Sequence, residues 1–233
     1  MNKPLELLCA GAAQGLVKAL QERFLADEGS VVNARFGAVG AIKELLLAGE
    51  PCDVMVATDA MIDSLVAEGR LQAATRRPLG RVRPGLAVRS GEPRPDVSTT
   101  EALKAALLGA EAIYFPDPVR STAGIHFANV MRALGIHDEL QPRFRNFPNG
   151  ATSMRELAAT KAARQIGCTQ VTEINYTDGI DLVGALPDRF ELATVYTAAT
   201  SAHAAQAELA TRFIALLAGP DSLALRKAGG FEF

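Results

Sequence analysis

The stretch LELLCAGAAQGLVKALQERFLADEGSVVNARFGAVGAIKELLLAGEPCDVMVA (residues 5–57) decides the fold class. Its short apolar runs alternate with longer amphipathic segments, which is the pattern of strands followed by helices that cover a mostly parallel sheet. The runs predict strands at Leu5–Cys9, Val31–Phe36 and Asp53–Ala57, with helices at Ala13–Leu25 and Ala38–Ala48 between them. The sequence therefore predicts an α/β protein.

The same alternation continues through the rest of the chain. Arg76–Pro95, rich in Arg, Pro and Gly, is expected to be one long strand that leaves the first group of elements, and Ala193–Tyr196 is strand-like again after Pro187. The other expected elements are helices from Thr58-Asp59 to Ala67, from Ser98-Thr99 onward, and at Thr122–Leu134, Ala151–Thr160 and Ala204–Leu217; strands at Ala112–Phe115, Gln165–Cys168 and Asp181–Val183; and a turn at 228–231.

Two strand-like crossings predict two lobes. If the middle of the chain is inserted between Gly80 and about Pro187, residues 1–80 and 188–233 form one lobe and residues 81–187 form the other. A cleft between lobes joined by two crossing strands is where a small ligand is expected to bind, and closure around the ligand is a hinge motion.

Composition excludes several classes of partner and site. The chain of 233 residues is 48% apolar and has a net charge of −2, and its longest basic run is the pair Arg76-Arg77, so nucleic acid is not expected as a partner. Cys9, Cys52 and Cys168 are scattered within apolar stretches, which indicates buried thiols rather than a disulfide or zinc framework. We expect no cofactor and no metal.

No apolar run reaches the roughly 20 residues that span a bilayer, so membrane insertion is not expected. The start of the chain is interrupted by Glu6 and has Leu8 before Cys9, which matches neither a secretory signal nor a lipoprotein cleavage site. The protein is expected to be periplasmic if a signal has been removed and cytoplasmic otherwise.

Several expected strands end in small or polar residues just before a helix begins. Because the first-turn N–H groups of a helix point outward from such an end, these loops are suited to binding an anion, and Gly or Ala there lets a ligand approach the backbone. The alternative for any one loop is a tight turn that small residues merely close. The candidate ligand-binding residues of these loops are Gly11, Ala12, Ala13, Gly37, Ala38, Val39, Arg120, Ser121, Thr122, Asn149, Thr169 and Gln170.

The loops and their neighbours form an ordered set of motifs. They are Ala-Gly-Ala-Ala at 10–13, Phe-Gly-Ala-Val-Gly at 36–40, Leu-Ala-Gly-Glu-Pro-Cys-Asp at 47–53, Asp-Pro at 117–118 with Thr-Ala-Gly-Ile at 122–125, and Ile-Gly at 166–167. This order, over nearly the whole chain, resembles the molybdate-binding proteins of ABC transporters, a branch of the type 2 periplasmic binding proteins. The resemblance implies their two-lobed fold, a small anionic ligand and an ABC transporter permease as a candidate partner.

The chain departs from that family where the anion would bind. In the family, two serines and a late tyrosine help hold the oxyanion, whereas Ala12-Ala13, Ala38-Val39 and Cys168-Thr169-Gln170 stand at the matching places here. Arg120 is an apparent gain, because a guanidinium matches a carboxylate fork; its alternative is a solvated residue at a helix start. Asn149 and Thr152 have the alternative of capping a helix.

The resemblance extends to aconitate isomerase, an enzyme that looks similar to these binding proteins and moves a double bond in a tricarboxylate. A 1,3-proton shift of that kind needs a base, and His126 and Glu173 are the candidates in this chain. We therefore expect a solute-binding protein for a small anion, more an organic carboxylate than molybdate. The alternatives are an isomerase of an unsaturated di- or tricarboxylate on the same fold and a cytoplasmic ligand sensor, so whether the chain is an enzyme stays open.

Overall fold

The computed structural model describes residues 3–233, which fold into two compact units. Unit 1 combines the chain up to Val82 with Thr194–Phe233, and unit 2 is Arg83–Ala193. The chain thus passes between the units twice, after Val82 and after Ala193. The sequence predicted these crossings near residues 80 and 187. None of the helices in the described residues is long and apolar enough to cross a membrane.

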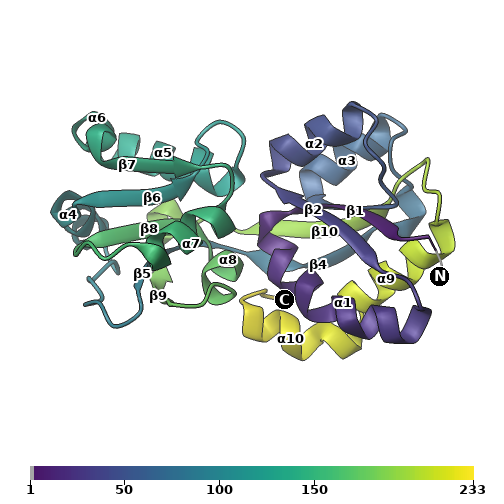
Figure 1. Ribbon diagram of the computed structural model, residues 1–233. Coiled ribbons are helices and arrows are strands. Elements are labelled where there is room, and N and C mark those ends of the chain that lie inside the picture. The colour runs from purple at the N-terminus through teal and green to yellow at the C-terminus, as the bar shows by residue number, and fades with distance from the viewer. Residues whose placement is uncertain (1–2) are drawn as a thin grey trace. The chain divides into compact units, whose positions relative to one another are not determined.

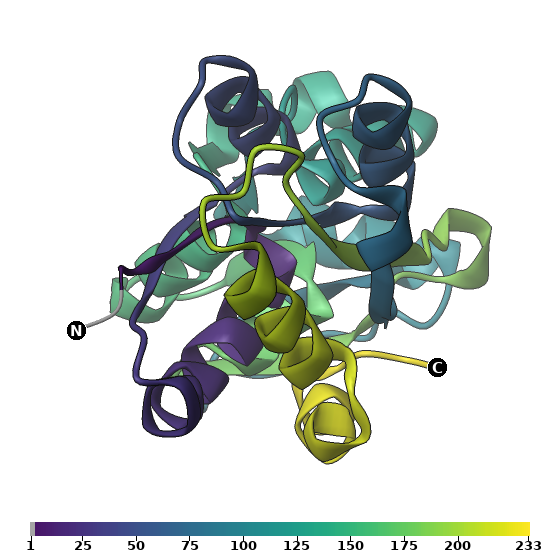
Figure 2. The same cartoon turned by 90° about the vertical axis from the view of Figure 1, so that its right-hand side faces the viewer.

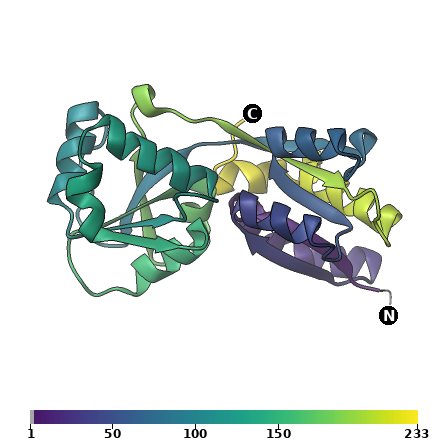
Figure 3. The ribbon, with the colours of Figure 1, turned by 90° about the horizontal axis from the view of Figure 1, so that it is seen from above.

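Unit 1 is a five-stranded sheet with helices on both faces. Helices α2 and α3 cover one face and α1 and α9 the other (Figures 1 and 2), and Figure 3 looks onto the side of α2 and α3. The ring of Phe24 in α1 meets that of Phe213 in α9 edge to face at 4.8 Å, which ties these two helices together. In sheet order the strands are β2 (Val32–Gly37), β1 (Leu5–Ala10), β3 (Val54–Thr58), β10 (Thr194–Thr200) and β4 (Arg77–Val82); the helices are α1 (Gln14–Glu28), α2 (Val39–Leu47), α3 (Asp59–Ala67), α9 (Ala207–Ala218) and α10 (Leu223–Gly229), with short 3-10 turns at Gly11–Ala13, Ala73–Thr75 and Pro220–Ser222.

Unit 2 repeats this plan. Leu103 of α4 and Phe127 of α5 belong to one apolar cluster, while Met154 of α7 and Ile174 of α8 belong to another that includes Ala87 of the sheet. Helices α4 and α5 therefore serve one core and α7 and α8 the other. In sheet order the strands are β7 (Phe144–Phe147), β6 (Ala112–Pro116), β8 (Gln165–Gln170), β5 (Pro84–Arg89) and β9 (Ile180–Ala185); the helices are α4 (Thr100–Gly109), α5 (Thr122–Ala133), α6 (His137–Leu140), α7 (Gly150–Ala159) and α8 (Val171–Asn175), with 3-10 turns at Gln141–Arg143 and Asp188–Phe190.

One strand in each sheet runs against its neighbours. β10 is antiparallel to β3 and β4, and β5 is antiparallel to β8 and β9, whereas β1–β3 and β6–β8 pair in parallel. β10 and β5 are the strands by which the chain enters each unit after a crossing. Because they are reversed, they begin where the parallel strands end: Tyr196 lies opposite Thr58, and Pro84 lies opposite Gln170. The chain thus enters each unit at the edge that carries its strand-to-helix loops.

A bulge in β4 is held by the C-terminal helix. Tyr196 pairs with Gly80 and Thr197 with Pro78, so Leu79 has no opposite residue in β10. Its carbonyl accepts a hydrogen bond of 2.7 Å from the buried guanidinium of Arg226, which also donates to the carbonyls of Ala218 and Gly219 at the end of α9. Arg226 therefore joins α10 to β4 and α9.

Two expectations about secondary structure were wrong, and some short elements were missed. The segment Arg76–Pro95 is not one strand: β4 and β5 belong to different sheets and meet at the crossing after Val82. The end of the chain contains helix α10 rather than only a turn, and the short elements β7, α6 and α8 were not predicted.

Gly124 lets the first turn of α5 pack directly on the end of β6. A Cβ atom at this position would lie 2.4 Å from the carbonyl oxygen of Pro116 and 2.3 Å from that of Asp117. Both contacts are with backbone, which cannot move aside as a side-chain tip can. Any larger residue must therefore push α5 away from the loop at residues 117–121.

We predict that Gly124→Ala lowers the free energy of unfolding by about 2–3 kcal/mol, because the added methyl group overpacks the contact. Gly109→Ala, at the end of α4, is the matched control: no atom lies within 4 Å of its Cβ position. It should leave stability unchanged or raise it by up to about 1 kcal/mol through helix propensity. Urea unfolding of both variants checks this, and equal stabilities would contradict the close packing of α5.

Candidate functional site

The loop edge of unit 1 presents two helix starts without side-chain caps. Ala10 at the end of β1 lies opposite Gly37 at the end of β2, so the helix starts that follow lie on neighbouring strands. Ala13, before α1, and Ala38, before α2, provide no side-chain hydrogen bond to the first turns of these helices. The structure thus brings together six of the predicted ligand-binding residues, Gly11, Ala12, Ala13, Gly37, Ala38 and Val39.

The third helix start on this edge, that of α3, is capped by a side chain and carries a carboxylate. The hydroxyl of Thr58 accepts a hydrogen bond from the amide of Met61, and the carboxylate of Asp59 accepts one of 2.6 Å from Thr197 and one of 2.8 Å from Arg76. The hydrogen bond from Thr197, followed by that from Arg76, holds the pKa of Asp59 below its usual range. An ionised carboxylate at this place disfavours an anion at the start of α3.

The loop edge of unit 2 is capped by two predicted residues. Ser121 accepts a hydrogen bond of 3.4 Å from the amide of Gly124, and Thr122 is the first residue of α5. Asn149 accepts one of 2.8 Å from the amide of Thr152 at the start of α7. For Asn149 this is the capping role that the sequence left as an alternative, whereas capping by Ser121 was not predicted.

Glu173 is a buried carboxyl group that joins three elements of unit 2. Its Oε2 accepts a hydrogen bond of 2.5 Å from the hydroxyl of Thr169 in β8, and its Oε1 accepts one of 3.2 Å from the amide of Ala151 in α7. The amides of Gly150 and Gln170 also bond to it. The carboxyl group therefore occupies the place at the start of α7 where a helix N-terminus would bind an anion.

Gly150 is what allows this arrangement. A Cβ atom there would lie 1.9 Å from the hydroxyl oxygen of Thr169 and 2.1 Å from Oε2 of Glu173. Burial raises the pKa of Glu173, although its hydrogen bonds to Thr169 and the backbone oppose that shift. All of these partners belong to unit 2, and only 7% of the residue is exposed.

His126, the other candidate base, makes a structural contact. Its Nε2 lies 2.7 Å from the carbonyl oxygen of Phe190, so the ring donates from Nε2 and links α5 to the 3-10 turn at Asp188–Phe190. In that tautomer only Nδ1 can accept a proton. The sequence offered no sign of this contact, because the two residues are 64 positions apart.

Two cationic residues stand on the loop edge of unit 2. Arg120 is exposed, and its amide donates to Oδ1 of Asp117 at 3.1 Å just before α5. Arg83 directly precedes β5, and its guanidinium pairs with Glu191 at 3.2 Å. Arg83 and Glu191 lie next to the two crossings, and the sequence analysis did not single out either of them. Thr169 and Gln170, at the end of β8, are fully buried.

Comparisons with known proteins agree on one family. The model of the bacterial extracellular solute-binding protein family matches residues 5–232. The chain belongs to this family. It is also 30% identical over 183 residues to an aconitate isomerase from a Pseudomonas species, an alignment that covers 78% of this chain and 68% of that protein.

Solved structures confirm the predicted fold. The periplasmic molybdate-binding protein of Azotobacter vinelandii superposes with a TM-score of 0.79 at 21% identity, over 98% of this chain and 99% of that one. A sulfate-binding protein of Mycobacterium tuberculosis gives a TM-score of 0.73 at 16% identity, over 99% and 86% of the two chains. The fold is the type 2 periplasmic-binding-protein fold, as the sequence motifs indicated.

The raised pKa of Glu173 predicts a pH dependence of stability. Because the folded protein holds this proton more tightly than the unfolded chain, whose Glu titrates near about 4.3, stability falls as pH rises from there through the raised pKa, and is flat above it. The Glu173→Gln variant lacks this slope, which is at most about 1.4 kcal/mol per pH unit.

Urea unfolding of the wild type and Glu173→Gln across this pH range measures the difference. Glu156→Gln, at an exposed position of α7, is the matched control and should follow the wild type. The free energy of unfolding of the wild type minus that of Glu173→Gln should fall as pH rises. A value that stays constant or increases with pH would contradict the burial of a protonatable carboxyl group at the start of α7.

Proposed function

We propose that this solute-binding protein takes up a small organic carboxylate rather than molybdate. The observation that carries the proposal is the pair of uncapped helix starts of α1 and α2 on adjacent strand ends of unit 1. The first-turn amides of α2, and the amides of the 3-10 turn Gly11–Ala13 that leads into α1, supply donors and positive partial charge for an anion. Since Ala13 and Ala38 add no hydroxyl group, these donors are backbone only.

The choice of a carboxylate rests on Arg120. A guanidinium binds the two oxygens of a carboxylate with parallel hydrogen bonds, a geometry that a lysine or a single amide does not offer. It stands in the loop before α5, on the edge at which the chain enters unit 2. That Arg120 contacts the carboxylate is part of the proposal.

The family also supports a role in transport. On this proposal the ligand-bound protein delivers its carboxylate to an ABC transporter permease. Binding alone is sufficient for that role, which needs no catalytic base.

We predict that cis-aconitate binds more tightly than molybdate and that Arg120→Ala weakens the carboxylate about 10- to 150-fold, since a hydrogen bond to a charged group contributes about 1.5–3 kcal/mol. Arg132→Ala, at the other end of α5, is the matched control and should leave the affinity unchanged. Titration calorimetry measures both. Tighter binding of molybdate, or equal affinities of the Arg120→Ala and wild-type proteins for cis-aconitate, would contradict the proposal.

The second candidate function is isomerisation of an unsaturated di- or tricarboxylate. It is favoured by the relative named aconitate isomerase, at 30% identity. Glu173 is the better candidate for the base, because burial raises the pKa of its carboxyl group above the usual range and so makes it a stronger base. To act as the base, Glu173 would have to give up its hydrogen bonds from Thr169 and Ala151 and contact the substrate instead. His126 would have to act through Nδ1.

Incubation with cis-aconitate in deuterated water, followed by NMR, separates the two functions. An isomerase incorporates deuterium and changes the isomer ratio, and Glu173→Gln lowers that rate by about 10²–10⁴-fold. If cis-aconitate binds without deuterium exchange, the protein is a binding protein and not an isomerase of this substrate. Exchange that survives both Glu173→Gln and His126→Ala would reject both residues as the base.

A further inference from the structure

Unit 2 contains a cavity of about 430 Å³. It lies at the end of the sheet opposite to the loop edge. Val88 of its lining is near the end of β5, and Ile166 is near the start of β8. The loop edge is at the start of β5 and the end of β8, so the cavity opens at the opposite end of these strands. It is therefore separate from the proposed carboxylate site.

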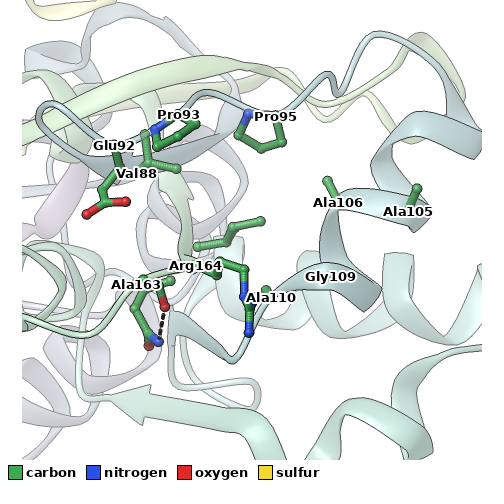
Figure 4. A pocket seen from close by; sticks show the side chains of 12 residues that line it. Val88, Glu92, Pro93, Pro95, Ala105, Ala106, Gly109, Ala110, Ala163 and Arg164 are labelled. Atoms are coloured by element: carbon green, nitrogen blue, oxygen red, sulfur yellow. Dashed lines mark hydrogen bonds between the residues drawn. The ribbon is translucent and has the colours of Figure 1, made fainter.

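Small and apolar side chains line this cavity. Figure 4 shows Ala105, Ala106 and Gly109 of α4 on one side and Pro93 and Pro95 of the preceding loop on another. Positions 105 and 109 are four residues apart and share one face of α4, while Leu103 and Leu107 of the same helix fill the core. The volume falls within the range of about 300–1,000 Å³ that small-molecule sites occupy.

The charges at the cavity are already neutralised. Glu92 forms an ion pair with Arg89, whose guanidinium also donates to the carbonyl of Thr160 at 2.7 Å. Arg164 forms an ion pair with Glu111. Neither charge is left for a ligand of opposite sign, so the lining favours an uncharged molecule.

Hydrogen bonds within unit 2 hold the walls of this cavity in place. The loop that carries Pro93 and Pro95 is anchored on β9, where Asp181 accepts hydrogen bonds of 2.8 Å from Ser90 and 3.0 Å from Arg94. On the opposite side, the backbone of Arg164 takes a left-handed φ of 51°, and its carbonyl accepts a hydrogen bond of 2.9 Å from the amide of Glu111. A preformed cavity loses little conformational entropy on binding.

We propose that this cavity is a second binding site, which takes an uncharged apolar small molecule. Its apolar lining supplies affinity through buried area, at roughly 25 cal/mol per Å². The proposal does not depend on the carboxylate site, and a ligand here should leave carboxylate binding unchanged.

The test uses N-phenyl-1-naphthylamine, an uncharged probe that fluoresces in apolar surroundings. We expect saturable binding of one molecule per chain, at least tenfold weaker in Gly109→Leu and in Ala105→Phe, whose larger side chains enter the cavity. Lys104→Leu, exposed on the same helix and outside the lining, is the matched control and should bind as the wild type does. Circular dichroism verifies that each variant is folded. If Gly109→Leu does not fold, Ala105→Phe still tests the proposal.

Three results would overturn the proposal. They are fluorescence that rises without saturation, wild-type affinity in a folded variant with a filled cavity, and equal binding of 8-anilinonaphthalene-1-sulfonate, which carries a charge on similar rings. Displacement of the probe by excess cis-aconitate would instead place it at the carboxylate site, and would equally reject the second site.

Discussion

The reversed strand in each sheet is the constraint on which the rest of the structure depends. β10 and β5 pair antiparallel with strands that otherwise run together, so the chain enters each unit at the edge where the parallel strands end. That edge is also where helices begin and where backbone amides lack partners within their own helix. Topology thus places the crossings and the strand-to-helix loops on the same edge of each unit.

The two loop edges are built differently from the same plan. In unit 1, Ala13 and Ala38 provide no side-chain cap for the first turns of α1 and α2. In unit 2, Ser121 and Asn149 cap α5 and α7, and Glu173 adds an internal carboxyl group at the start of α7.

Most of the fold could be predicted because short stretches of the sequence determine its strands and helices. The apolar runs and the small residues after them place β1–β3 and their helices to within a few residues. The failures are long-range: Arg76–Pro95 has one composition but two sheets, and α10 depends on contacts of Arg226 with Leu79, 147 positions away. In the site, the loops were visible in the sequence, but the pairing of Glu173 with Thr169 and the start of α7 was not, because only the fold brings Gly150 to it.

The central claim is that the uncapped starts of α1 and α2 bind the anion, and a charge placed there tests it most directly. Calorimetry with cis-aconitate should compare the wild type with Ala38→Asp, which puts a carboxylate before α2, and with Thr99→Asp, which puts the same charge at the N-cap of α4 in unit 2. The account predicts at least a tenfold loss of affinity, about 1.4 kcal/mol, for Ala38→Asp and none for Thr99→Asp. Unchanged affinity in a folded Ala38→Asp protein would contradict it.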